Sequence, residues 1–300
     1  MQSLGYLAAL AAATTWALSS LLTVGPVREL GAIAFNTFRM LCVALALSVL
    51  LLMTGNFSLP SNDLLWPLIA SGFIGIFLGD TFLFGCVKRL GPRMSGLLFS
   101  TNAPMSFVIG IYWLDETYQL VNFLGVALVT SGVMLALVFR RTAGTHHWEQ
   151  SMGNVGTGIL AGILAALCQS LGTFIAFDAM QAGTHPATAT TIRVWVAFIF
   201  LFLTLFISRG FKGFHVYQTM KALSALRIIA SGFLGMGLGM SLLLWAIKVA
   251  PVGIVATLSA TTPVIMLPIV WLLTKERPQI ASIWAAVTVV AGVALVFSSG

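Results

Sequence analysis

Ten long apolar stretches account for almost the whole chain, and they constrain its fold more than any other feature. A helix that crosses the hydrocarbon core of a bilayer needs about 20 mostly apolar residues. Charged residues make up 8% of the chain, against about 25% in a typical soluble domain. We therefore predict an all-α integral membrane protein with ten transmembrane helices and no soluble catalytic domain. The stretches lie near residues 4–24, 31–54, 64–87, 94–113, 119–139, 154–180, 186–208, 223–247, 250–273 and 279–298.

One segment of the chain occurs twice. Ala70–Gly79 reads ASGFIGIFLG and Ala230–Gly239 reads ASGFLGMGLG, so seven of ten positions are identical. The landmarks after each copy stand in the same order, which implies duplication of a whole unit. We predict two five-helix units, residues 1–140 and 153–300, joined by a polar linker at 141–152. The paired landmarks are Lys88 and Lys248, Pro92 and Pro251, Pro104 and Pro263, Glu116 and Glu276, and Gly132 and Gly292.

The basic residues are distributed unevenly between the predicted connections. Connections after the odd-numbered stretches hold twelve Lys and Arg residues, whereas those after the even-numbered stretches hold Lys248 alone. By the positive-inside rule, the odd connections face the cytoplasm and both termini lie outside. A unit with an odd number of spans must cross the membrane in opposite directions in its two copies, and equivalent connections do exchange their charge. The twelve residues are Arg28, Lys88, Arg89, Arg93, Arg140, Arg141, Arg209, Lys212, Lys221, Arg227, Lys275 and Arg277.

The predicted architecture is therefore an inverted repeat. In many secondary transporters, two such repeats rock against one another and open a site near the bilayer midplane to each face in turn. This architecture favours transport as the function. The competing interpretation is a duplication that only enlarged a helical bundle for packing or assembly.

The segment around the first intramembrane proline, together with its second copy, resembles the EamA family of the drug/metabolite transporter superfamily. The resemblance covers nearly all 300 residues. It implies ten spans in two five-span repeats and the movement of small metabolites, often by export of amino acids or related compounds, through a central cavity. Similar proteins carry amino acids, purine-like compounds, sugars, nucleotide sugars or cationic toxicants, so the resemblance leaves the substrate open. The residues that carry it are Pro104, Ile111, Trp113, Glu116, Gly125 and Gly132, with Pro263, Trp271, Glu276 and Gly292 in the second copy.

Asp80 is the outstanding candidate for a functional residue. It lies inside the third stretch, where an ionisable group is costly unless it is paired or hydrated. Arg39, in the second stretch, lies roughly 12 Å from the cytoplasmic end, and Asp80 lies roughly 10 Å from the same end. We predict that the two residues pair, either as a coupling site whose protonation follows substrate binding or as a static ion pair. The second copy has Met240 at the Asp80 position, which favours the functional interpretation.

Arg193 occupies the place of Arg39 in the second unit, where ATTIR stands against FNTFR. No aspartate matches it. Two interpretations follow for its charge. Arg193 either binds a carboxylate or phosphate of the substrate, or it snorkels to the outer interface and meets Asp178.

Further polar residues inside the apolar stretches are candidates for binding the substrate. Amides are the more informative ones, since hydroxyls readily bond back to their own helix. Several stand just before an intramembrane proline, where the missing N–H frees a carbonyl and bends the helix. For most hydroxyls, plain packing between helices is the alternative. The candidates are Trp16, Asn36, Thr101, Asn102, Gln169 and Thr261, with Pro104 and Pro263 as the bending residues.

Other kinds of site find no support in the sequence. Cys42, Cys86 and Cys168 lie singly inside predicted spans, and no His, Cys or carboxylate cluster has metal-ligand spacing. We expect no cofactor, no metal and no catalytic residue. The net charge of +7 is explained by membrane orientation, so we expect no nucleic-acid partner. The expected partners are a small-molecule substrate, the lipid bilayer and, for coupling, protons, and the oligomeric state is left open.

These observations lead to one functional prediction and two rivals. We predict a multi-pass secondary transporter of the cytoplasmic (inner) membrane that exports a small polar or amphipathic metabolite, such as an amino acid, by alternating access. The first rival is a multidrug or toxic-cation exporter that uses Asp80 as its buried anion. The second is an intramembrane enzyme or scramblase, which would need a catalytic constellation or a polar groove.

Overall fold

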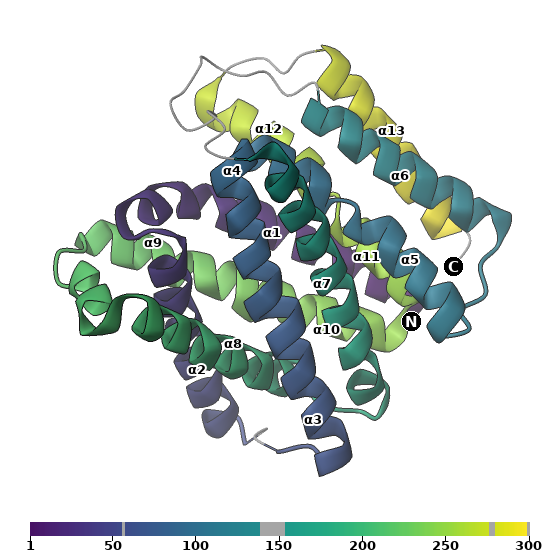
Figure 1. The fold of residues 1–300 in the computed structure, drawn as a ribbon. Coiled ribbons are helices and arrows are strands. Elements are labelled where there is room, and N and C mark those ends of the chain that lie inside the picture. Colours follow the sequence, from purple (N-terminus) through teal and green to yellow (C-terminus); the bar gives the residue numbers. More distant parts are fainter. Residues whose placement is uncertain (56–57, 139–153, 276–279, 299–300) are drawn as a thin grey trace.

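The computed structural model describes residues 1–55, 58–138, 154–275 and 280–298, and every regular element in these ranges is helical (Figure 1). The predicted linker 141–152 and the landmark Glu276 lie outside the described residues. The first half contains α1 (Gln2–Leu30), α2 (Ala32–Met53), α3 (Asn62–Ser71), η1 (Gly72–Leu78), α4 (Gly79–Phe99), α5 (Asn102–Trp113) and α6 (Leu120–Val138). The second half contains α7 (Val155–Gln181), α8 (Pro186–Arg209), η2 (Gly210–Tyr217), α9 (Ala222–Gly232), η3 (Phe233–Gly239), α10 (Met240–Val249), α11 (Val252–Ser259), α12 (Thr262–Thr274) and α13 (Ile280–Ser298).

The described helices account for the ten predicted spans. Nine helical segments are long and apolar enough to cross a membrane, and the shorter apolar segment Leu120–Ala136 of α6 provides the tenth. Spans three and eight are composite, because α3, η1 and α4 as far as Leu90 form one span, as do α9, η3 and α10. The prediction of an all-α membrane protein with ten spans is confirmed for the described part of the chain.

Span three and span four are joined by a reversal inside α4. Helical geometry is assigned through residues 88–93, where the sequence predicts a connection. Ser95 Oγ nevertheless lies 3.1 Å from Cys86 Sγ. Nine residues of straight α-helix extend roughly 13.5 Å, so the chain must turn back between these two residues. The short helical turn keeps the backbone hydrogen-bonded while the two spans run side by side.

Equivalent helices of the two halves run antiparallel to each other. Helices α6 and α13 lie side by side (Figure 1), and Gly125 and Val296 approach at one end of the pair while Gly132 and Val289 approach at the other. The interface of α4 with α7 likewise has its counterpart in that of α10 with α1. This arrangement is an inverted repeat, as the sequence predicts. The rings of Tyr6 and Phe297 lie 5.2 Å apart, so the start of α1 and the end of α13 are neighbours.

The duplicated glycine-rich segments form two π-helices, η1 and η3. Short π-helical segments are rare and often occur at functional sites. Each is packed tightly against a helix of the other half: a Cβ on Gly75 would lie 2.9 Å from Gly172 Cα on α7. The Ser71 hydroxyl donates to Gly172 O, and Ser19 on α1 donates to Ser231 O at 2.8 Å. Small side chains at both copies thus let the backbones approach closely.

The largest buried apolar cluster lies where α1, α2, α8, α10 and α11 meet. It includes Ala9, Met40, Val194, Leu244 and Val255. Helices from both halves contribute, so the two repeats share one core. The buried charged residues lie beside this core, on α2, α4 and α8.

Candidate functional site

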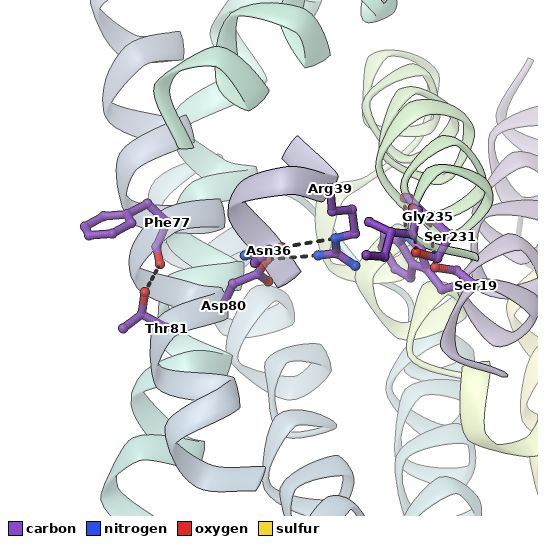
Figure 2. Close-up of polar contacts among 10 residues, drawn as sticks. Ser19, Asn36, Arg39, Phe77, Asp80, Thr81, Ser231 and Gly235 are labelled. Carbon is purple, nitrogen blue, oxygen red and sulfur yellow. Dashed lines mark hydrogen bonds and ion pairs between the residues drawn. The ribbon is translucent and has the colours of Figure 1, made fainter. Parts of the chain in front are cut away.

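Three side chains from α2 and α4 form a buried polar cluster (Figure 2). Arg39 Nη2 donates to Asp80 Oδ2 at 3.1 Å, and Asn36 Nδ2 donates to the same oxygen at 2.8 Å. Arg39 Nε donates to Asn36 Oδ1 at 3.0 Å, which closes the triangle. The structure therefore pairs Arg39 with Asp80, as their common depth in the sequence indicates, and it adds Asn36 to the pair. Whether the pair couples transport stays a prediction.

Local sequence explains how this cluster is positioned. Asn36 and Arg39 are one turn apart on α2, so both face α4. Asp80 is the second residue of α4, directly after the π-helix η1. The stem of Arg39 packs on Gly232, whose added Cβ would lie 3.0 Å from Arg39 Cγ. Figure 2 shows the Arg39 side chain between Asp80 on one side and the group of Ser19, Ser231 and Gly235 on the other.

A cavity of about 370 Å³ with a mostly apolar wall lies next to this cluster. It lies between the start of α2, the middle of α4 and the end of α8. Asn36 lines the cavity and also donates to Asp80, so the cavity ends beside the ion pair. All three of these segments adjoin predicted cytoplasmic connections. Lys88 and Arg209, two basic residues of these connections, are part of the wall. The polar residues of the wall are Asn36, Thr81, Lys88, Ser208 and Arg209.

Arg193 is fully buried on α8, with 0% of its surface exposed. Its Nη1 lies 3.2 Å from Met240 Sδ, and Nε and Nη2 have no hydrogen-bond partner among the described residues. The alternative in which Arg193 snorkels outward to Asp178 is wrong, because Asp178 is exposed at the end of α7 while the guanidinium is held inside the bundle. The α8 backbone packs so closely on η1 that a Cβ on Gly72 would lie 2.7 Å from Arg193 Cα. This packing directs the side chain inward.

The remaining candidates are divided between helix interfaces. Trp16 Nε1 donates to Gly235 O at 2.7 Å, so its polar atom holds α1 against η3. Asn102 is buried, its Oδ1 has no partner among the described residues, and its carbonyl accepts from Ser170 on α7. Gln169 lies half-buried on the same helix. Thr261 is buried and bonds back to Leu258 O, which is the packing role expected of most hydroxyls.

Pro104 and Pro263 each stand just after a break in their span. The chain leaves helical geometry between α4 and α5, before Pro104, and between α11 and α12, before Pro263. This is the interruption that a missing proline N–H produces. Beside the first break, Thr101 and Pro104 line an open and almost entirely apolar depression of about 390 Å³ between α5 and α7. The structure does not join this depression to the Arg39 cluster.

Several residues of the cavity wall escape prediction from the sequence. Thr81, Lys88, Ser208 and Arg209 belong to it, yet hydroxyls near helix ends and basic residues in connections are common in membrane proteins. Thr81 follows Asp80 directly, which is the one signal that pointed to it. Arg209 lies 170 residues after Arg39 in the sequence, and only the antiparallel pairing of α2 with α8 brings it near.

Two carboxylates of the first half cap helices of the second half. Glu116 accepts from Val252 N at 2.6 Å at the start of α11 and also from the Tyr118 hydroxyl. Burial of Tyr118, and secondarily the charge of Glu116, raise the pKa of this phenol. Glu29 accepts from the Ser224 hydroxyl and from Lys221 N at 2.9 Å, and these two hydrogen bonds lower the pKa of Glu29. Both carboxylates satisfy free N–H groups at helix starts.

The fold and the buried charges define a membrane protein of ten helical spans that is built as an inverted repeat. The sequence model of the EamA-like transporter family matches residues 3–138 and 156–298, one match in each half. The chain therefore belongs to the EamA-like transporter family and is a membrane transporter of the drug/metabolite type.

Known structures support the fold assignment. One solved structure, titled "Crystal structure of protein", is similar to the chain with a TM-score of 0.76 and 16% sequence identity. The similarity covers 100% of this chain and 98% of that one. At this identity the likeness shows the fold alone. A search of curated protein sequences gave no significant match.

Proposed function

We propose that this protein is a secondary transporter that exports a small polar or amphipathic metabolite, with amino acids as the favoured class, across the cytoplasmic membrane by alternating access. The observation that carries the proposal is the Asn36–Arg39–Asp80 cluster beside a cavity that Asn36 lines. A solute in this cavity would meet the amide that donates to Asp80.

The inverted repeat supports the alternating part of this proposal. Helices α2 and α8 pack against each other in opposite directions, and Arg39 and Arg193 are each the eighth residue of their helix, counted from Ala32 and from Pro186. The two arginines therefore lie at mirrored depths, roughly 12 Å from opposite ends. Rocking of the repeats would exchange the environments of the two ends.

The charges around the cavity favour a solute with a negative group over a toxic cation. Asp80 is already neutralised by Arg39 at 3.1 Å, and the cavity wall carries Lys88 and Arg209. A cation would be repelled at the wall and would have to displace Arg39 from the only carboxylate in the described cluster. An amino acid presents both a carboxylate and an ammonium group, which suits a site with both signs of charge.

Transport by purified protein in proteoliposomes tests the proposal. Vesicles preloaded with an unlabelled amino-acid mixture should accumulate each labelled member of the mixture that the protein carries, and vesicles without protein should not. The same assay is repeated with organic cations and with a proton gradient of either sign. Accumulation of cations alone would support the rival exporter, and equal uptake by empty vesicles would contradict transport.

Asp80→Asn tests whether the cluster couples transport to protons. We expect counterflow at equal pH to persist, because an amide keeps the shape of the site, and gradient-driven accumulation to be lost, because the amide cannot release a proton. Lys212→Gln, at an exposed position of η2, is the matched control for a changed charge. Unchanged gradient-driven accumulation in Asp80→Asn would contradict coupling through this residue.

A further inference from the structure

Arg193 and Arg39 offer the same edge of the guanidinium group to very different surroundings. In Arg39, Nε and Nη2 donate to Asn36 and Asp80. In Arg193, the same two nitrogens are buried and have no partner among the described residues. The edge that binds a carboxylate in the first half thus has no hydrogen-bond partner among the described residues in the second half.

The second half has lost both partners of this edge. Met240 stands at the Asp80 position, and its sulfur, a weak acceptor, contacts Nη1 instead. Thr190 stands at the Asn36 position, where its hydroxyl donates to Pro186 O and accepts from Ser241 at 3.1 Å. Neither side chain serves the Nε and Nη2 edge.

An unpaired guanidinium at this depth is costly, because a buried charge needs a counter-charge and hydrogen bonds. Among the described intramembrane residues, Arg39 and Asp80 compensate each other, so Arg193 leaves one uncompensated positive charge. We propose that the Nε and Nη2 edge of Arg193 binds a carboxylate group of the transported solute. This inference rests on the proposed transport function and adds the substrate class to it.

Each of the two walls around Arg193 includes a π-helix or the residue that follows one. On one side a Cβ on Gly75, within the π-helix η1, would lie 3.2 Å from Arg193 Nη2. On the other side Met240 directly follows the second π-helix, η3. A π-helix is less regular than an α-helix, and such segments recur where helices change shape.

A carboxylate fits this edge better than other groups do. Its two oxygens accept two parallel hydrogen bonds from a guanidinium, and its single negative charge cancels the single positive charge. A neutral amide would leave the charge uncompensated, and a cation would add to it. The site would therefore select a monocarboxylate or an amino acid over its amide.

Thermal unfolding of the purified full-length protein in detergent tests this assignment without requiring transport. The probes are 4-methylpentanoate and L-leucine, each beside its amide, and acetate beside acetamide. We expect the acids to raise the Tm and the amides to leave it unchanged. Arg193→Gln should weaken the apparent affinity for the acids at least about tenfold, because it removes a buried charge-assisted contact. Lys212→Gln should respond as the wild type does.

Met240→Asp provides a second readout that keeps the arginine in place. The new carboxylate stands where Asp80 stands in the first half, so we expect a higher Tm without ligand and no further rise with the acids. Equal shifts from acids and amides, an acid response that survives Arg193→Gln, or a chloride titration that reproduces the whole effect would each overturn the carboxylate assignment. Proteoliposomes that transport only solutes without a carboxylate group would also overturn it and leave the transport function standing.

Discussion

The two halves of this protein keep an arginine at the same place in the repeat and surround it differently. Arg39 meets Asp80 and Asn36 beside a cavity, whereas Arg193 meets a methionine sulfur and is fully enclosed. Duplication therefore preserved the scaffold while the chemistry diverged. The comparison teaches that substitutions at equivalent positions of an inverted repeat give its two halves different polar interiors.

The largest expected effect distinguishes the paired carboxylate from its methionine counterpart. Asp80→Leu leaves Arg39 buried without a counter-charge, and we expect it to lower the free energy of unfolding by about 3–5 kcal/mol. Met240→Leu, the matched change in the second half, should cost less than about 1.5 kcal/mol, because it conserves volume and polarity. Unfolding in mixed micelles titrated with SDS measures both. Equal losses of unfolding free energy in the two variants would contradict the proposed difference between Asp80 and Met240.

The amide beside the ion pair offers the next comparison. Asn36→Ala removes the amide that donates to Asp80 and accepts from Arg39. The change should lower the free energy of unfolding by about 1–3 kcal/mol, because the charged groups stay buried. Thr190→Ala, at the equivalent position, should cost about 1 kcal/mol, the net value of a typical hydrogen bond. The same titration measures the difference. A larger loss in Thr190→Ala would show that the second half depends on its own polar network.

Two glycines of the π-helices, at positions that are not equivalent in the repeat, differ in how closely their neighbours approach. Gly75→Ala should lower the free energy of unfolding by about 1–3 kcal/mol. Its Cβ would lie 2.9 Å from the Gly172 backbone, and relieving this clash requires the two helices to move apart. In the second π-helix, Gly237 has its nearest neighbour at 3.6 Å, and Gly237→Ala should be neutral or stabilise by up to about 1 kcal/mol. The unfolding midpoints of the two variants, each compared with that of the wild type, measure this difference. Equal tolerance would show that η1 is not a close-packed contact.

The smallest expected effect concerns a contact between the halves at the surface. Hydrogen bonds from Ser224 and Lys221 lower the pKa of Glu29, so this contact stabilises the fold above the ordinary glutamate pKa of about 4.3 and is lost as the pH falls through the lowered value. The Tm of Glu29→Gln should therefore lie slightly below that of the wild type at neutral pH, and the two should converge in acid. Ser224→Ala should narrow the gap at neutral pH. A gap that is constant with pH would exclude ionisation of Glu29 as its cause.

Much of the fold was predictable because the lipid bilayer constrains the length of each span and the distribution of charged residues. Spans of about 20 apolar residues, basic connections and paired landmarks indicated ten helices in an inverted repeat, and Arg39 with Asp80 could be paired by depth alone. The reversal near Cys86 and Ser95 and the π-helices at the duplicated segment were not predictable. Both depend on how closely neighbouring backbones approach.

The environment of Arg193 shows the limit of sequence reasoning most clearly. Its distance from the end of α8 allowed either an outward path to Asp178 or an inward position. The structure selected the inward position, because Gly72 lets η1 pack directly against the α8 backbone. Trp16 is a similar case, since only its contact with Gly235 O shows that it joins helices.

The sequence by itself determined that this is a ten-span membrane protein with a duplicated unit, which charges lie within the bilayer, and that the two copies differ at Asp80 and Met240. These properties follow from the cost of transferring residues into lipid, which each residue contributes locally. Only the tertiary structure decided that the Arg193 guanidinium lies inside the bundle without a counter-charge and where a cavity lies beside the Arg39 cluster. Those properties depend on contacts between segments more than 100 residues apart, such as Ser71 with Gly172 and Trp16 with Gly235, which helix packing alone brings together.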